Sequence, residues 1–294
     1  MITEKKKIAI LGTGKIAVDL LYKARDSKSL QCALFAGRRK GSEGLKIAKS
    51  IGVETSNAGI SAVMTQADDL DILFDATSAR SHAEHWGLLR ETGIKVIDMT
   101  PSGIGDAIVP SVNIAKANLS RNVNMISCGG QASIPIVAAV ARAVKGIRYV
   151  EVVSSIASNS AGPATRLNLD EYIAGTEKGI SQLSGIKNTK VIIVLNPAEP
   201  PVTMQTTISF EISDPPMDRI AAAVLKKSDE VKAYVPGYDI IVNPRLVQRD
   251  RVTVMIKVTG RGDYLPKYAG NLDIINCAAI AVAEAEGACN GTSA

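Results

Sequence analysis

Cys128 is the residue of this chain whose surroundings best suit covalent chemistry. It lies in the stretch Ser127-Cys-Gly-Gly-Gln-Ala-Ser133, where two glycines leave the backbone free to wrap a reacting carbonyl. The pattern predicts a helix over 133–145, with Ser133 as its N-cap and Pro135 in its first turn. A cysteine near a helix N-terminus has its thiolate favoured, and nearby backbone N–H groups can hold an oxyanion. The alternative is a small buried cysteine beside a tight turn.

The supply of histidine limits how Cys128 could be activated. The chain has only His82 and His85, both in a predicted helix over 80–92, where surface or cap positions are their expected roles. Enzymes with a Cys–His pair bring the histidine from the second domain, and here that half of the chain has none. Activation would therefore fall to the helix end, backbone donors or a carboxylate. The remaining cysteines are interpreted as packing or surface residues: Cys32, Cys277 and Cys289.

A glycine-rich turn near the N-terminus is suited to binding the phosphates of a dinucleotide. Gly12-x-Gly14-x-x-Ala17 follows a short apolar run and opens a helical pattern. Gly12 permits the tight turn, Gly14 lets the backbone approach the pyrophosphate, and Ala17 allows close helix packing. The helix N-terminus adds unpaired N–H groups and a favourable dipole. The motif is weak alone, but it gains weight within an alternating α/β pattern.

The end of the next predicted strand bears on the choice between NAD and NADP. An acid is expected there if the plain ribose of NAD is bound, but this chain has Arg38, Arg39 and Lys40. Guanidinium groups at that point can accept a 2′-phosphate, which favours NADP. The alternative is a basic loop in solvent, so the choice of nucleotide stays open.

The elements that must position these residues change character at Cys128. Before it, short apolar strands alternate with helical patterns, as in a doubly wound parallel sheet. These elements are predicted at 7–11, 32–36, 43–51, 70–75, 80–92 and 95–98. After it, longer β-like segments dominate, which indicates an α+β domain. These segments lie at 149–156, 190–195, 203–212 and 251–258, with helices near 216–233 and 269–287.

The predicted architecture is therefore α/β with two domains. An N-terminal Rossmann domain with a doubly wound sheet spans 1–127 and 266–294, because the Ala-rich C-terminal helix is expected to return to it. An α+β catalytic and dimerisation domain spans 128–265. A sheet-rich second domain favours a homo-oligomer.

Composition and charge exclude several other classes of protein. Hydrophobic residues make up 46% and charged residues 21% of the 294 residues, which is ordinary for a globular protein. The net charge of +5 is spread along the chain, so no nucleic-acid partner is expected. The apolar runs are too short to span a membrane. Separated cysteines without metal-type spacing, and the lack of a signal peptide, predict a reduced cytoplasmic protein with no metal site.

Ordered blocks over most of the chain match one enzyme family. The blocks are Gly12–Ile16, Phe74–Ala79, Asp98–Pro101, Val109–Asn113, Asn124–Ala132, Ser155–Pro163, Leu195–Pro201, Tyr234–Tyr238 and Tyr264–Asp273. In these blocks the chain resembles the acylating acetaldehyde dehydrogenases that partner 4-hydroxy-2-oxovalerate aldolases in the catabolism of aromatic compounds. The resemblance implies an oxidoreductase, an acetaldehyde dehydrogenase (acetylating), that converts a short aldehyde to acyl-CoA. It also implies an aldolase subunit as a candidate partner.

The resemblance assigns roles to particular residues. Cys128 falls on the cysteine that forms the acyl thioester, with NAD or NADP as hydride acceptor and coenzyme A as acyl acceptor. Asn113 and Gln131 are further candidates for hydrogen bonds to the substrate carbonyl. The residues expected to contact the nucleotide, from the motif and the resemblance together, are Gly12, Thr13, Gly14, Lys15, Ile16, Arg38, Arg39, Thr77, Ser78, Asn159, Ser160, Ala161, Gly162, Pro163, Ala164, Thr165, Arg166, Leu167 and Asn271.

The chain departs from this family at three places. The family has an acid near Arg39. Where the family reads Met-Arg-Asp-Thr, this chain has Met204-Gln-Thr-Thr207, so Thr206 replaces an aspartate associated with acyl transfer. The stretch between Tyr238 and Tyr264 is also shorter, in a domain that makes subunit contacts in the family.

These departures leave three alternatives open. The first is an NADP-linked reductase of another acyl thioester in a biosynthetic pathway. The second is an aspartate-semialdehyde or acyl-phosphate type of reductase, which shares the architecture but expects a second-domain histidine. The third is a nucleotide-binding subunit without turnover, against which the retained Cys128 argues.

Overall fold

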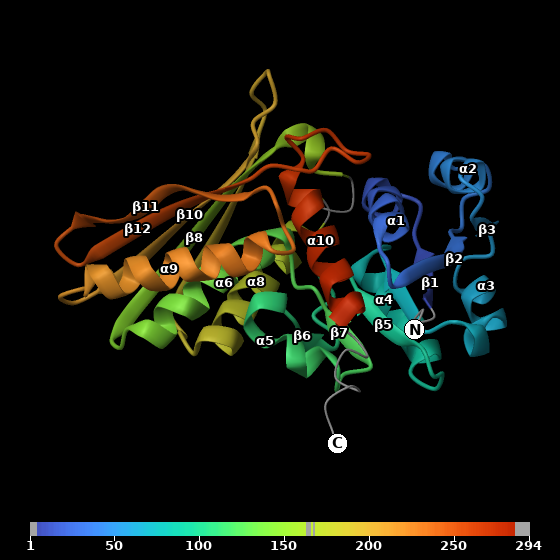
Figure 1. The fold of residues 1–294 in the computed structure, drawn as a ribbon, viewed down its shortest axis with the longest axis horizontal. Coiled ribbons are helices and arrows are strands. Elements are labelled where there is room, and N and C mark those ends of the chain that lie inside the picture. The colour runs from blue at the N-terminus through green and yellow to red at the C-terminus, as the bar shows by residue number, and fades with distance from the viewer. Residues whose placement is uncertain (1–4, 163–165, 167, 286–294) are drawn as a thin grey trace. The chain divides into compact units, whose positions relative to one another are not determined.

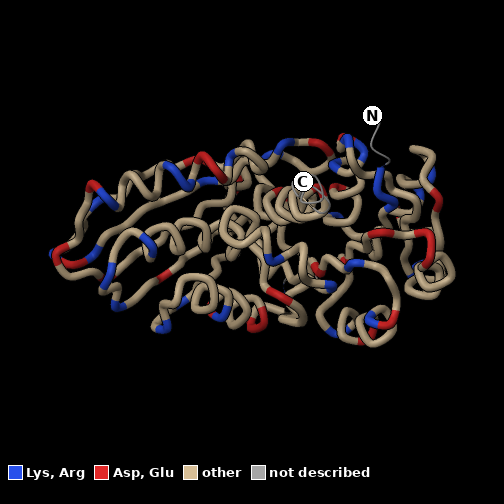
Figure 2. The backbone as a smooth tube through the Cα atoms, turned by 60° about the horizontal axis from the view of Figure 1, so that its bottom comes forward, with Lys and Arg blue, Asp and Glu red and all other residues tan. Residues whose placement is uncertain are grey.

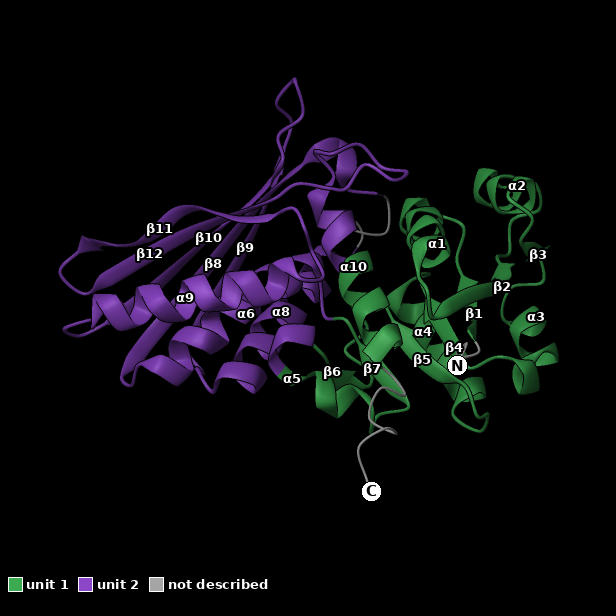
Figure 3. Ribbon diagram, in the orientation of Figure 1, with its two compact units in different colours: residues 1–108, 113–125, 276–294 green, residues 109–112, 126–275 purple. Residues whose placement is uncertain are grey.

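The protein forms two compact units in a computed structural model that describes residues 5–162, 166 and 168–285 (Figure 1). Unit 1 comprises residues 1–108, 113–125 and 276–294, and unit 2 comprises 109–112 and 126–275 (Figure 3). The two units divide the chain close to Cys128. The functional division of the chain into domains at 127/128 and 265/266 stays a prediction.

Unit 1 is built on a parallel sheet of the Rossmann type. Its strand order is β3-β2-β1-β4-β5-β7-β6, and every pairing in it is parallel. The strands are β1 (Lys6–Leu11), β2 (Leu30–Ala36), β3 (Glu54–Ser56), β4 (Ile72–Asp75), β5 (Lys95–Asp98), β6 (Asp106–Ala107) and β7 (Asn122–Asn124). The helices are α1 (Lys15–Asp26), α2 (Glu43–Ser50), α3 (Ile60–Thr65), α4 (Ala79–Leu89) and α5 (Pro110–Ala117), with η1 (Ala67–Asp69) as a short 3₁₀ turn.

The strands of unit 1 form because their apolar runs can be buried on both faces. Residues Ile8 to Leu11 of β1 are at most 1% exposed, and β4 and β5 are buried along their whole length. A strand between two layers of helices has no solvent face, so it needs no polar alternation. The predicted doubly wound sheet is confirmed.

Unit 2 contains a mixed five-stranded sheet in the order β11-β12-β10-β8-β9. Only β8 and β9 pair in parallel. The strands are β8 (Ile147–Ala157), β9 (Thr189–Asn196), β10 (Met204–Ile212), β11 (Tyr238–Gln248) and β12 (Arg251–Val258). Burial alternates along β10 and β12, so one face of the sheet is covered. The helices α6 (Cys128–Ala143), α8 (Leu169–Ser184) and α9 (Met217–Lys232) lie along that face (Figure 1), and η2 (Ser158–Ser160) follows β8.

The C-terminal helix α10 (Gly270–Ala285) returns to the Rossmann unit, as predicted. Asn276 donates a hydrogen bond from Nδ2 to the Ile16 carbonyl (3.1 Å) and another to Asp19 Oδ2 (2.8 Å) in α1. Asp19 also forms a buried ion pair with Lys23, with 2.8 Å between Oδ2 and Nζ. Polar groups this deeply buried have to be paired, so the network fixes α10 against α1.

Basic residues alternate with acidic residues along the course of the backbone (Figure 2). Within the residues that the structure describes, no helix is both long enough and apolar enough to cross a membrane.

Candidate active site

Cys128 is the first residue of helix α6. Ser127 is the N-cap, and its Oγ accepts a hydrogen bond from the Gly130 N–H at 2.9 Å. The predicted start at residue 133 is wrong, because a capped first turn accommodates the two glycines as helix. Ser133 is an interior residue whose hydroxyl donates to the Gly129 carbonyl (2.7 Å), and Pro135 lies inside the helix. The cysteine therefore stands directly on the helix N-terminus.

The Cys128 thiol is partly buried and is held by neutral hydrogen-bonding groups. Its Sγ lies 3.9 Å from the Tyr172 hydroxyl oxygen, to which the thiol donates. Burial raises the pKa of Cys128 to about 11, while hydrogen bonds from Tyr172 and from the N–H groups of Gly129 and Cys128 lower it. The helix end acts in the expected direction, but burial outweighs it, and the resting thiol is protonated near neutral pH.

Two backbone N–H groups of the first turn of α6 are already engaged. The Gly130 N–H is taken by the Ser127 side chain, and the Gln131 N–H bonds the Ser127 carbonyl at 2.9 Å. Any oxyanion hole that uses this turn must draw on the N–H groups of Cys128 and Gly129, since the cap uses the next two.

The two candidate carbonyl donors lie in different units. Gln131 is fully buried in the first turn of α6. Asn113 interrupts α5 with a non-helical backbone (φ −147°, ψ 37°), and its Nδ2 donates to the Ala107 carbonyl at 2.9 Å. This bond gives Asn113 a local role in unit 1, and the carbonyl contacts of both residues stay predictions.

The glycine-rich turn after β1 is shaped by close backbone contacts. Gly12 has φ +128°, and a Cβ there would lie 2.5 Å from the Ala76 carbonyl oxygen. A Cβ on Gly37 would lie 2.3 Å from Thr13 Cγ2, so the turns after β1, β2 and β4 meet where those parallel strands end. Gly14 is the exposed N-cap of α1 and has no capping side chain. The N-terminus of α1 at this edge of the sheet could hold a dinucleotide pyrophosphate, and that role stays a prediction.

Two further predicted nucleotide contacts take part in the local fold after β4. The Thr77 hydroxyl donates to Asp75 Oδ1 at 2.5 Å. Ser78 is the N-cap of α4 and accepts a hydrogen bond from the Ser81 N–H at 3.2 Å. In the loop after β2, Arg38 and Arg39 are exposed.

The predicted nucleotide contacts of unit 2 are described in part. Asn159 Nδ2 donates to Glu199 Oε1 (3.2 Å), and the Arg166 guanidinium bonds the carbonyls of Ser158 and Ala161. Asn271 is 2% exposed, and among the described residues its Oδ1 has no hydrogen-bond partner. A buried acceptor of this kind fits a ligand amide. Four predicted contacts lie outside the described residues: Pro163, Ala164, Thr165 and Leu167.

His82 and His85 are buried, so the expectation that they occupy surface or cap positions is wrong. Both rings bond Asp75 Oδ2 through Nδ1, at 3.0 Å and 2.8 Å. Burial opposes ionisation of Asp75, but hydrogen bonds from His82, His85 and Thr77 outweigh it and lower its pKa to about 2. Burial likewise disfavours charge on His82, but the Asp75 bond and the Asp98 charge raise its pKa. Within the described part of the chain, no group of three or more His, Cys, Asp and Glu residues could hold a metal ion.

The ionised Asp75 is expected to make unit 1 sensitive to acid. Its pKa is lowered from 3.8 to about 2, so its stabilisation is present above about pH 4 and is lost as the pH falls towards 2. The shift corresponds to about 2 kcal/mol. Urea unfolding at pH 6 should therefore show Asp75→Asn destabilised by at least this amount, whereas Glu84→Gln, an exposed acid on α4, should change little. An advantage of the wild type over Asp75→Asn that did not shrink at pH 3 would contradict this assignment.

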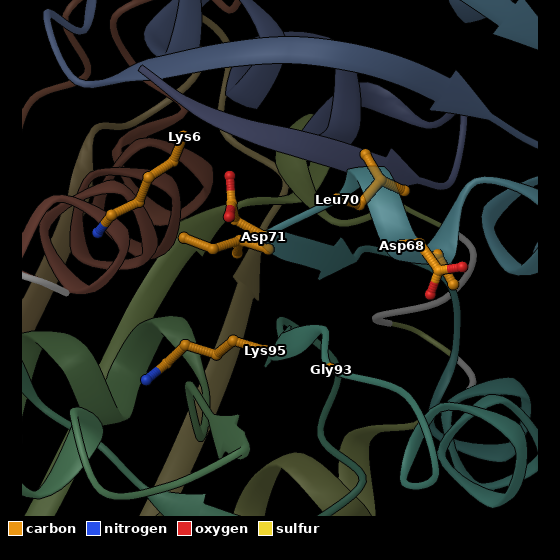
Figure 4. A pocket seen from close by; sticks show the side chains of 8 residues that line it. Lys6, Asp68, Leu70, Asp71, Gly93 and Lys95 are labelled. Carbon is orange, nitrogen blue, oxygen red and sulfur yellow. The ribbon is translucent and has the colours of Figure 1, made fainter. Parts of the chain in front are cut away.

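A cavity of about 420 Å³ in unit 1 lies away from this edge of the sheet (Figure 4). Lys6, Ile72 and Lys95 line it, and these residues begin β1, β4 and β5. The amine of Lys6 donates to the Ala283 carbonyl at 3.1 Å, and that of Lys95 to the Ala117 carbonyl at 2.5 Å. Ligands of open α/β sheets bind at the carboxyl ends of the strands. We therefore assign this cavity no part in the active site.

Comparison with known proteins defines the class. Aspartate semialdehyde dehydrogenase II from Vibrio cholerae, complexed with ASA, shares the fold with a TM-score of 0.66 and 13% identity, over 96% of this chain and 98% of that one. This likeness shows the fold alone. The sequence relatives below make this chain an aldehyde dehydrogenase, an oxidoreductase that uses a nicotinamide nucleotide.

The family follows from the sequence relatives. Acetaldehyde dehydrogenase from Pectobacterium atrosepticum is 50% identical over 285 residues, which cover 96% of this chain and 96% of that protein. The enzyme of that name from Spirochaeta aurantia is 50% identical over 278 residues, covering 95% of this chain and 93% of its own. A family model for the dimerisation domain of prokaryotic acetaldehyde dehydrogenase matches residues 128–266. The chain belongs to the acetaldehyde dehydrogenase family.

Proposed function

We propose that this protein oxidises a short aldehyde to a thioester on Cys128 and transfers the acyl group to coenzyme A. The observation that carries the proposal is the position of Cys128 on the capped N-terminus of α6. There its sulfur faces a tyrosine hydroxyl and two backbone N–H groups, all donors that favour a thiolate. Membership of the acetaldehyde dehydrogenase family supports the aldehyde as substrate.

The proposed reaction begins when the Cys128 thiol gives up its proton to solvent and its sulfur bonds the aldehyde carbon. The carbonyl π electrons move to oxygen, where the Cys128 and Gly129 N–H groups are placed to stabilise the charge. A nicotinamide nucleotide, when bound, would supply the acceptor for the hydride that leaves this carbon as the C=O bond re-forms and gives the thioester. The coenzyme A thiol then attacks the thioester and releases the Cys128 thiolate.

Each unit, taken by itself, has residues that suit a group of the nucleotide. In unit 1, Gly12 lets the turn after β1 pack against the Ala76 backbone, and the N-terminus of α1 that follows this turn suits a pyrophosphate. In unit 2, the buried Asn271 Oδ1 is available as an acceptor for the nicotinamide carboxamide. These residues would hold the nucleotide, together with the predicted contacts Thr13, Gly14, Lys15, Ile16, Thr77 and Ser78.

Thr206 makes the acyl acceptor the part of the proposal that most needs a test. A threonine hydroxyl is not a base near neutral pH, so the coenzyme A thiol must be deprotonated by another group or by solvent. The assay supplies acetaldehyde or propanal with NAD or NADP, and either coenzyme A or a simple thiol. Formation of NAD(P)H and acyl-CoA supports the proposal. Absence of both would refute it, and equal turnover with a simple thiol would refute coenzyme A as the specific acceptor.

NADP is the nucleotide that the loop after β2 favours. No acid stands at the end of this strand, and Arg38 and Arg39 are exposed. Guanidinium bonds to a phosphate are worth about 1.5–3 kcal/mol each. Arg38→Ala and Arg39→Ala should therefore raise the KM for NADP about tenfold or more and leave that for NAD nearly unchanged. Lys49→Ala, which removes a charge from α2, is the control. An equal effect of the arginine variants on both nucleotides would contradict the prediction.

A strict NADP preference with turnover only of another acyl thioester would favour the biosynthetic reductase instead.

A second copy of this chain is the partner that unit 2 favours. The matched family model describes a dimerisation domain, and the edge strands β9 and β11 carry exposed apolar side chains. These are Ile192, Val194, Ile241, Leu246 and Val247, all 38–47% exposed. We propose a homo-oligomer formed through this sheet. We also propose a cytoplasmic location, in keeping with the thiols of Cys32, Cys128 and Cys277. An aldolase in aromatic catabolism is the second proposed partner.

A further inference from the structure

The hydroxyl group of Tyr172 is in contact with the Cys128 sulfur. Tyr172 lies in the first turns of α8 and is only 6% exposed. Its Oη is 3.9 Å from Cys128 Sγ and accepts a hydrogen bond from the resting thiol. A phenol can both accept and donate, so its O–H can turn towards the sulfur once the thiol has lost its proton. The same contact then serves the thiolate.

Gly129 makes room for this hydroxyl. A Cβ on Gly129 would lie 2.0 Å from Tyr172 Oη and 3.2 Å from Ser154 Oγ. Such approaches cannot be relieved cheaply, because Tyr172 and Ser154 are both buried. The first glycine after the cysteine is thus required by the protein's own hydroxyl groups, whatever substrate is bound.

Two further hydroxyls continue the contact into the sheet. Ser154 of β8 lies beside the Tyr172 hydroxyl, because a single Cβ on Gly129 would meet both side-chain oxygens, and hydrogen bonding with Ser154 acts to lower the pKa of Tyr172. The Ser154 Oγ also lies 2.9 Å from Thr206 Oγ1 of β10. Ser154 and Thr206 are register partners on adjacent strands and are at most 1% exposed. With each hydroxyl donating to the next, the O–H groups of Thr206, Ser154 and Tyr172 all point towards the sulfur.

The surroundings of the Cys128 thiol explain why aligned hydroxyl groups would be important. The groups that act on the Cys128 thiol in opposition to burial are neutral donors, namely Tyr172 and the N–H groups of Gly129 and Cys128. A buried thiolate that lacks a charged partner depends on such donors.

We propose that Tyr172 donates a hydrogen bond to the Cys128 thiolate, and that Ser154 and Thr206 are positioning residues that orient its hydroxyl. The proposal rests on Cys128 as the nucleophile of the proposed function and extends it to the groups that make the thiolate accessible. Thr206 then acts through Ser154 and Tyr172, with no role as a base.

Alkylation of Cys128 by iodoacetamide tests this proposal without aldehyde, nucleotide or coenzyme A. The rate is followed from pH 7 to 9 on the full-length protein, by mass spectrometry of the peptide that contains Cys128. In this range the rate reports the thiolate fraction. Tyr172→Phe should slow alkylation about tenfold at each pH, which corresponds to a pKa raised by one unit. Tyr238→Phe removes another fully buried hydroxyl, which bonds the Ala132 carbonyl of α6 at 2.8 Å, and should react like the wild type.

Substitutions at Thr206 test the positioning role without changing the tyrosine. Thr206→Val keeps the shape and removes the hydroxyl, so alkylation should slow about two- to fourfold, whereas Thr206→Ser should stay close to the wild type. Equal rates for Tyr172→Phe and the wild type, with both folded, would overturn the proposal. If Tyr172→Phe does not fold, equal rates for the Val and Ser variants would overturn it. If the variants are alkylated more slowly as predicted, but the wild-type protein does not turn over aldehyde, only the proposed function would be refuted.

Discussion

Replacing Cys128 by serine is expected to lower aldehyde turnover about a thousandfold or more, because the variant keeps the shape of the site and loses the nucleophile. A serine hydroxyl at this position would have the same N–H donors and the same Tyr172 contact. Its proton is far harder to remove than that of a thiol, and no histidine in unit 2 is available to take it. The loss should appear in kcat, with the nucleotide KM little changed.

The acyl-enzyme gives a second measurement of the same prediction. Wild-type protein supplied with acetaldehyde and nucleotide, but no coenzyme A, should gain the mass of one acetyl group on the Cys128 peptide, and Cys128→Ser should gain none. Cys32→Ser is the matched control. Burial raises the pKa of Cys32 to about 12, and its thiol bonds the Leu34 carbonyl in β2, so it is not expected to react. Full turnover by a folded Cys128→Ser variant would disprove the nucleophile assignment.

The course of the main chain could be predicted where burial alone decides it. The apolar runs of β1, β4 and β5 have one stable environment, the middle of a parallel sheet. The strands β10 and β12, along which buried and less buried residues alternate, also have one, a sheet covered on one face. The helix start at Cys128 was missed because two glycines indicate a turn when their contacts are unknown. Gly130 is in fact fitted against Ile126 and Ser127, where a Cβ would lie 2.9 Å and 3.1 Å from side-chain atoms.

Helix α8 was not predicted, so Tyr172, the residue of α8 that contacts Cys128, was not identified either. Gly175 and Gly179 interrupt its helical pattern, and glycine weakens a helix unless packing requires it. Packing does require it at Gly179, where a Cβ would lie 3.1 Å from the side chains of both Ile126 and Ile134. The small residue lets α8 approach α6 closely enough to bring Tyr172 to Cys128.

The sequence of the strands did contain a sign of the other two hydroxyl groups, those of Ser154 and Thr206. Ser154 continues the inward-facing positions of Val150 and Val152, and Thr206 stands between Met204 and Ile208 on the inward face of β10. A polar residue at an inward position needs a partner, so it marks a site even when the partner is unknown. The partners of His82 and His85 had no such signal, since Asp75 and Asp98 reach them only through the fold of the sheet.

The second large effect is expected from Asp19→Ala, which should destabilise the protein by about 3–5 kcal/mol. Both side chains of the Asp19–Lys23 pair are at most 2% exposed, so removing the carboxylate takes a close negative charge away from a buried ammonium and deprives Asn276 of an acceptor. Urea unfolding near pH 7 measures the loss.

Glu84→Ala is the matched control for this prediction. It breaks an ion pair of the same i,i+4 spacing with Arg80, but there the side chains are 64% and 92% exposed, so the change should be within a few tenths of a kcal/mol. A double variant, Asp19→Ala with Lys23→Met, removes the buried ammonium together with the carboxylate and should recover part of the lost stability, since apolar groups can replace a buried pair. If the single and double variants were equally unstable, the cost would come from lost packing or from Asn276, and the buried charge would not be its cause.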